Sequence, residues 1–96
     1  MVESMIRRVE IAKRVEKQLR KVPDYIKVNL MIWVAAVELD GVEEVRKVPG
    51  YHDEPLKGSR AGQRSIRLSR AYRAIYELKK DAVEFVSIEE VSKHDY

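Results

Sequence analysis

Three stretches of alternating apolar and polar residues occupy the last third of the chain and limit what it can fold into. They cover residues 63–68, 72–79 and 82–92, and only short turns separate them. Consecutive strands joined by short turns pair in antiparallel order. The sequence therefore predicts a three-stranded antiparallel meander in this region.

Two helices are predicted before the meander. The first starts at Ala12, where alternation gives way to helical spacing, and ends at Pro23, which also fits the first turn of the next helix. The second has the stronger signal, with Gly41 as a break near its C-terminal end. Its apolar positions are Ile26, Leu30, Trp33, Val34, Val37, Val42 and Val45.

A short strand from Val9 to Ala12 precedes the helices and is expected to join the sheet. Residues 48–62 contain two prolines and three glycines and are expected to form a long irregular loop. The predicted order is βααβββ in one domain spanning residues 1–96. The fold class is α+β, with two N-terminal helices packed on one face of a small, mainly antiparallel four-stranded sheet. The other face is left open.

Composition excludes several classes of protein. The chain has no cysteine, which rules out disulfides and thiolate metal sites and fits a reducing cytoplasm. No segment resembles a signal peptide, and no apolar run approaches the roughly 20 residues of a membrane-spanning helix. His52 with Asp53 and Glu54 offers too few ligands for a metal site. We expect a cytoplasmic protein without a cofactor or a membrane partner.

Positive charge is concentrated in one part of the chain. Residues 1–55 are neutral, residues 56–80 carry a net charge of +7, and residues 81–96 carry −4. Arginine recurs at every third position from Arg64 to Arg73. Such a concentration indicates a polyanion or an acidic partner, although a solvated charged surface is the simpler alternative.

The register of the first two meander strands follows from their apolar residues. If residues 69–71 form the loop, one face of the hairpin becomes apolar and points toward the helices. A loop one residue shorter would mix apolar and charged residues on both faces. The preferred register pairs Leu68 with Tyr72, Ile66 with Ala74 and Arg64 with Tyr76 on the apolar side, and Arg67 with Arg73 and Ser65 with Ile75 on the other.

Two arginines directly opposite each other destabilise a sheet by about 0.2–1 kcal/mol. A site that binds phosphate gains from such a pair, because guanidinium groups grip phosphate oxygens in a fork. The alternative is that Glu89 and Glu90 on the acidic third strand neutralise Arg67 and Arg73.

The chain ends in His94, Asp95 and Tyr96, directly after the last predicted strand. Histidine changes charge near neutral pH and is therefore a candidate general acid or base, which Asp95 could orient. Tyr96 could donate or accept a proton. The alternative is a frayed, inert terminus.

The stretch PLKGSRAGQRSIRLSRAYRAIYE, followed by a last strand and KHDY, resembles the RelE/HigB group of the RelE/ParE toxin superfamily. These toxins belong to bacterial type II toxin–antitoxin pairs. The strongest match runs from Pro55 to Tyr96, and the earlier strand and helices are compatible with it. The hallmarks are Leu-Lys-Gly before the sheet, Ser-Ile-Arg on one strand and Tyr-Arg on the next.

The resemblance implies a ribosome-dependent endoribonuclease that cuts mRNA without metal, in a reaction in which the 2′-hydroxyl of the messenger attacks the adjacent phosphate. Arg73 would bind that phosphate, Arg67 and Lys57 would support it, and His94 and Tyr96 would take part in catalysis. HigB-like relatives often have histidine where this chain has Glu54, so His52 is a possible substitute, and Asp95 a possible participant. The further cations expected to bind RNA are Arg60, Arg64, Arg70 and Lys93.

The expected partners are a cognate antitoxin protein, the ribosome and mRNA. Two other functions stay open. One is a ParE-like gyrase poison on the same fold, which is not an enzyme. The other is a simple basic module that binds nucleic acid.

Overall fold

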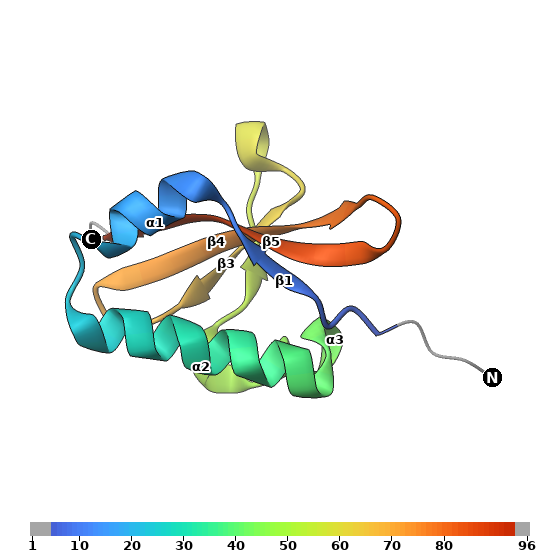
Figure 1. The fold of residues 1–96 in the computed structure, drawn as a ribbon, viewed down its shortest axis with the longest axis horizontal. Coiled ribbons are helices and arrows are strands. Elements are labelled where there is room, and N and C mark those ends of the chain that lie inside the picture. Colours follow the sequence, from blue (N-terminus) through green and yellow to red (C-terminus); the bar gives the residue numbers. More distant parts are fainter. Residues whose placement is uncertain (1–4, 94–96) are drawn as a thin grey trace.

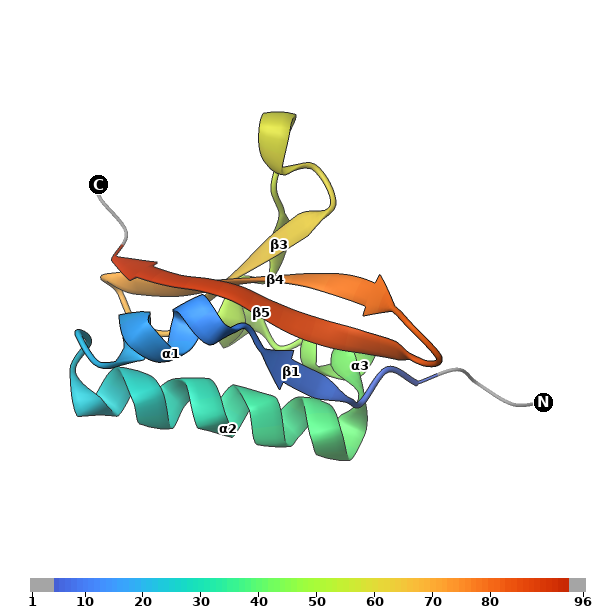
Figure 2. The same cartoon turned by 45° about the horizontal axis from the view of Figure 1, so that its top comes forward.

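The structure, a computed structural model, describes residues 5–93 as one sheet covered by helices on a single side (Figures 1 and 2). The strand order is β1-β5-β4-β3-β2, with β1 parallel to β5 and all other neighbours antiparallel. The elements are β1 (Val9–Ile11), α1 (Lys13–Leu19), α2 (Asp24–Asp40), α3 (Val42–Val45), η1 (Pro49–Tyr51), β2 (Glu54–Pro55), η2 (Gly58–Arg60), β3 (Gln63–Arg67), β4 (Tyr72–Lys80) and β5 (Glu84–Lys93).

The predicted fold class is confirmed, with one difference in the number of strands. The sheet has five strands, because Glu54 and Pro55 pair with β3 as a two-residue edge strand too short to show alternation in the sequence. The predicted break at Gly41 is confirmed, because it divides the second helical segment into α2 and α3. Gly41 has a φ of 88°, in the region that favours glycine, and an added Cβ would lie 3.1 Å from Met5 Cε.

The edge of β5 is completed by α1. β1 pairs with β5 only as far as Ile88, which leaves the backbone groups beyond it without a strand partner. The amide of Ala12 donates to the Ile88 carbonyl at 3.0 Å, and Arg14 Nε donates to the Glu89 carbonyl at 2.7 Å. The amide of Val91 donates to Gln18 Oε1 at 2.8 Å. The Ala12 amide and two side chains of α1 therefore replace a missing strand and protect this edge.

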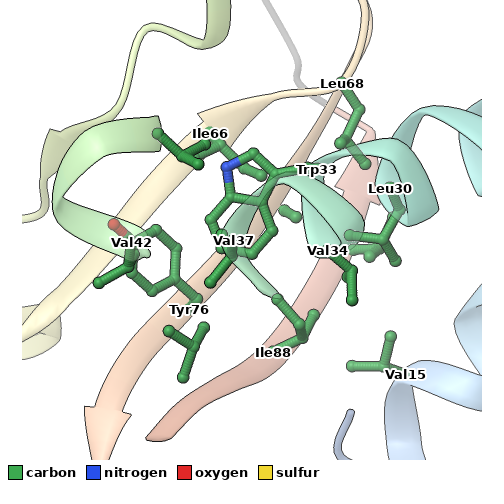
Figure 3. Packing of buried hydrophobic residues seen from close by; sticks show 14 of the residues in the cluster. Val15, Leu30, Trp33, Val34, Val37, Val42, Ile66, Leu68, Tyr76 and Ile88 are labelled. Atoms are coloured by element: carbon green, nitrogen blue, oxygen red, sulfur yellow. The ribbon is translucent and has the colours of Figure 1, made fainter. Parts of the chain in front are cut away.

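The core lies between the sheet and the helices (Figure 3). Trp33 of α2 and Tyr76 of β4 are both fully buried, and their ring centroids lie 5.1 Å apart. Ile66 and Ile88 reach the same layer from β3 and β5. The apolar side of the β3–β4 hairpin thus packs against α2, as the predicted register requires. No helix within residues 5–93 has the length and apolar character needed to cross a membrane.

A buried polar network holds the segment before β2 against the sheet. The carboxylate of Asp53 is 1% exposed and accepts hydrogen bonds from Arg64 Nε at 2.6 Å and from the Tyr76 hydroxyl at 2.5 Å. Burial, followed by the interaction with Asp53, raises the pKa of Tyr76 to about 12. The buried carboxylate is therefore paired with one cation and one neutral donor.

This network predicts a stability change in alkaline solution. The unfolded chain loses the Tyr76 proton near the ordinary pKa of 10 and the folded chain near about 12. The stabilisation by Tyr76 is thus complete below pH 10 and lost as the pH rises toward 12. Tyr76→Phe should lower the free energy of unfolding by about 1–3 kcal/mol at pH 8. Urea unfolding should show this difference shrinking between pH 10 and 12, and a constant difference would contradict the assignment.

Candidate functional site

The candidate site is centred on two arginines on the helix-free face of the sheet. Arg67 of β3 and Arg73 of β4 are direct cross-strand partners, which confirms the predicted register, and Ser92 of β5 continues the row. Among residues 5–93 neither arginine has an acidic partner. Arg73 Nη1 reaches only the Ser65 hydroxyl, at 3.4 Å, and the buried Nε of Arg67 has no hydrogen-bond partner. We call Arg67 and Arg73 the arginine pair.

The neighbouring glutamates are bound to other cations. Glu89 contacts Arg14 at 2.6 Å and Lys79 at 3.1 Å, and it accepts a hydrogen bond from the Ser87 hydroxyl. Burial alone would raise the pKa of Glu89, but the Ser87 hydrogen bond and Lys79 lower it below the ordinary value. Glu89 is therefore ionised at neutral pH and already paired. The alternative in which this glutamate neutralises the arginine pair is therefore wrong.

Glu90 is held by Arg60, whose Nη2 lies 2.6 Å from Glu90 Oε1. Burial opposes ionisation of Glu90, but the Arg60 hydrogen bond outweighs it and keeps the pKa of this carboxyl below its usual value. Glu90 pairs with Ile75, which is two residues after Arg73 on β4 and therefore points to the same face. It thus belongs to the same face as the arginine pair, and its charge is balanced by a residue from the η2 loop.

A β-bulge explains why the two glutamates find different partners. Ile75 pairs with Glu90 and Tyr76 with Ile88, so Glu89 is an extra residue without a partner on β4. An extra residue re-aims the side chains around it. Glu89 therefore reaches Arg14 of α1, while Glu90 keeps its place beside Ile75. Sequence reasoning missed this bulge.

The η2 loop stands on the helix-free side of the sheet, opposite α2 (Figure 2). The Leu56 amide donates to the Gln63 carbonyl at 2.9 Å and closes the loop at its base. The Arg60–Glu90 pair ties its tip to β5. Lys57, exposed at the start of η2, has no ion pair within the described residues. The loop thus places Lys57 and Arg60 on the side of the arginine pair.

Arg64 does not belong with these cations. It shares the helix-facing side of the hairpin with Tyr76, and its guanidinium is paired with the buried Asp53. The expectation that Arg64 binds RNA is replaced by a role in the Asp53 network. The physical reason is alternation, because residues 64 and 67 of one strand point to opposite faces.

The remaining predicted residues lie around the periphery. Arg70 is exposed in the turn between β3 and β4. Lys93 is the exposed last residue of β5 and pairs with Tyr72, on the face opposite Ser92. His52 is exposed just before Asp53, with a left-handed φ of 46°. His94, Asp95 and Tyr96 lie outside the described residues. They follow Lys93 in the chain.

A pocket borders the arginine pair from the α2 side. Its volume is about 320 Å³, and Arg67 is its charged lining residue. Sequence reasoning missed this pocket because it joins three separate segments. The lining residues are Asn29, Ile32, Val48, Gly50, Tyr51, Arg67 and Leu68. Among residues 5–93, no group of three or more His, Asp or Glu side chains is arranged to hold a metal ion.

Several solved structures have the same small α+β fold. No protein-family model and no curated protein matches the chain. Similar structures include a YoeB/ParE toxin from Agrobacterium tumefaciens (14% identity, 92% of this chain and 99% of that one covered, TM-score 0.65) and YafQ from E. coli (18%, 90% and 91%, 0.67). The toxin–antitoxin complex RelBE2 from Mycobacterium tuberculosis matches with 25% identity, over 91% of this chain and 96% of that one, at a TM-score of 0.56.

These similarities confirm the predicted resemblance at the level of the fold. The chain has the fold of the RelE/ParE superfamily of toxins. Several of the similar structures are complexes of a toxin with its antitoxin, including RelBE2 and DinJ–YafQ from E. coli.

The unpaired arginines predict a measurable cost in stability. Arg67→Gln removes the repulsion within the arginine pair and should raise the free energy of unfolding by about 0.2–1 kcal/mol. The gain should shrink at high salt, which screens charges. Urea unfolding of both proteins at low and high salt measures it. A destabilised variant would mean that Arg67 has a stabilising partner.

Proposed function

We propose that the chain is the toxin of a toxin–antitoxin pair and a ribosome-dependent, metal-independent mRNA endonuclease. The observation that carries this proposal is the arginine pair, two adjacent guanidinium groups on the helix-free face without an acidic partner among residues 5–93. Phosphate oxygens satisfy both groups and remove their repulsion.

In the proposed reaction, the 2′-oxygen of the messenger forms a bond to the adjacent phosphorus, and the bond from phosphorus to the 5′-oxygen breaks. A base takes the proton from the 2′-hydroxyl, and an acid gives one to the leaving 5′-oxygen. Arg73 binds the non-bridging oxygens and stabilises the charge that develops on them, with Arg67 and Lys57 in support. His94 and Tyr96 are proposed as the groups that move protons.

The surroundings of the arginine pair support this division of roles. Glu89 and Glu90 are ionised but bound by Arg14, Lys79 and Arg60, so they add little repulsion toward RNA. Arg60 helps to fix the loop that carries Lys57. We propose that Arg60, Arg70 and Lys93 add contacts to ribosomal or messenger phosphates, and that a cognate antitoxin silences the toxin. The RelBE2 and DinJ–YafQ complexes support the antitoxin partner.

Arg73→Ala should abolish growth arrest on expression while leaving the fold intact. Arg20→Ala, which removes an exposed arginine at the end of α1, is the matched control and should remain fully toxic. Primer extension on cellular mRNA after brief induction should show codon-registered cuts with the wild type and the control, and none with Arg73→Ala. Full toxicity of a folded, well-expressed Arg73→Ala protein would remove Arg73 from the mechanism.

The same experiment separates the competing function. One similar structure carries the name YoeB/ParE, so a ParE-like gyrase poison is the alternative function. A gyrase poison would leave mRNA intact and cause supercoiling defects. A simple nucleic-acid-binding module would produce neither result.

His94→Ala tests the proposed proton transfer separately from binding. The variant should slow mRNA cleavage by about 100-fold or more, in keeping with the loss of a general acid or base. Its affinity for ribosomes, measured by co-sedimentation, should change much less. Equal losses of cleavage and binding would assign His94 a binding role only.

Binding to the ribosome should be strongly salt-dependent, because each protein–phosphate contact releases counterions. Removing one phosphate contact should reduce the slope of log affinity against log salt by about 0.7–0.9. We expect this reduction for Arg73→Ala and none for Arg20→Ala. An unchanged slope for Arg73→Ala would show that this guanidinium does not bind phosphate in the complex.

A further inference from the structure

The outer side of α2 carries a row of exposed apolar side chains. Tyr25, Val28 and Ile32 are 55%, 56% and 55% exposed, Leu39 is 73% exposed, and Ala35 is also exposed. We call these five residues the outer stripe. They recur at alternating intervals of three and four residues, so they form one line along the helix. The buried face of α2 lies on the other side and consists of Ile26, Leu30, Trp33, Val34 and Val37.

α2 is therefore apolar on two opposite sides. No charged residue occurs between Lys27 and Glu38, and the one polar residue there, Asn29, donates from its amide to the Leu68 carbonyl at 2.8 Å. A helix that is apolar all round is normally buried on all sides. Figures 1 and 2 show that the sheet and α1 cover only the inner side of α2. The outer stripe thus lacks a cover within residues 5–93.

We propose that the outer stripe is a homodimer interface, on which α2 of a second copy packs in the antiparallel direction. Spacing by three and four residues is the pattern by which two helices interlock. Val28, Met31, Ile32 and Ala35 line a shallow apolar depression that can receive side chains from a facing helix. The two ends of the stripe, Tyr25 and Leu39, each lie seven residues from Ile32. A two-fold axis near Ile32 would therefore bring Tyr25 of each copy close to Leu39 of the other.

The charged residues beside the outer stripe determine the relative direction of the two α2 helices in the dimer. Lys27 and Glu38 are eleven residues apart, about three helical turns, so they lie on the same flank of α2. In an antiparallel pair, Lys27 of each copy lies near Glu38 of the other, giving two complementary contacts. A parallel two-fold pair would place Lys27 and Glu38 of the two copies on opposite sides of the interface, without such contacts. The contact of Lys27 with the exposed Asp24, 3.3 Å long, is a weak competitor.

The dimer is compatible with the proposed toxin function but does not depend on it. The outer stripe faces away from the sheet, and the arginine pair belongs to the helix-free face. Ile32 and Arg67 come together only at the pocket of about 320 Å³. Two copies joined through α2 therefore leave the helix-free face of each copy uncovered, while the second copy lies beside the pocket that Arg67 lines.

The first test measures association of the purified chain by sedimentation equilibrium. The wild type should dimerise at micromolar concentration. Ile32→Glu would bury two like charges at the centre of the interface and should weaken dimerisation at least about 100-fold. Val83→Glu makes the same apolar-to-acid change at a residue 51% exposed in the β4–β5 turn and should leave dimerisation unchanged.

The second test measures direction. The chain lacks cysteine, so single thiols can be introduced without background. Tyr25→Cys and Leu39→Cys place thiols about 21 Å apart along one helix. With a short bifunctional thiol crosslinker, an antiparallel dimer should give crosslinked pairs when the two variants are mixed, and few when either is treated alone. Crosslinking of each variant with itself would indicate a parallel pair and overturn the proposed arrangement.

A wild-type chain that stays monomeric at concentrations of about 100 µM would overturn the dimer itself. Equal weakening by Ile32→Glu and Val83→Glu would do the same, because the effect would then not belong to α2. If the chain is monomeric and a co-produced antitoxin protects the thiol of an Ile32→Cys variant from alkylation, the outer stripe serves that antitoxin, and the proposal is wrong.

Discussion

The register between β3 and β4 is the constraint on which both the core and the candidate site depend. The turn that sets it is closed by the Ser69 hydroxyl, which accepts hydrogen bonds from the amides of Ala71 and Tyr72, each at 3.1 Å. A slip of one residue would exchange the two faces of β3 and expose Ile66. The burial of Ile66 and Tyr76 therefore enforces the arginine pair on the other side. The repulsion within the arginine pair costs much less free energy than the loss of a packed core would.

Acidic residues near the site are arranged so that they do not relieve this repulsion. Asp53 pairs with Arg64 on the helix side, Glu89 turns through the bulge toward Arg14, and Glu90 binds Arg60. Each carboxylate reduces the charge of one arginine and holds a loop or helix in place. The cations that remain without such a partner within the described residues include Arg67 and Arg73. The positive charge that these carboxylates leave unbalanced is thus concentrated on the helix-free face.

The sequence predicted what alternation can encode and missed what depends on distant contacts. Apolar residues alternate cleanly along β3 and β4, so their register and the facing of Arg67 and Arg73 followed directly. Alternation carries no information about a single inserted residue such as Glu89, because its neighbours are apolar on one side and charged on the other. The partner of Arg64 lies across an irregular loop with no periodicity. The residues expected after Lys93 to complete the site lie outside the described part of the chain.

The two surfaces that distinguish this chain meet at the pocket beside Arg67. Ile32 belongs to the outer stripe and Arg67 to the arginine pair, and both line that pocket. A helix packed on the outer stripe would remove solvent near Ile32 and so change the surroundings of the Arg67 guanidinium, whose Nε already lacks a partner. Desolvation makes an unpaired cation less stable and strengthens its attraction for an anion. A partner that covers α2 at Ile32 would therefore change the surroundings of Arg67 without contacting the helix-free face.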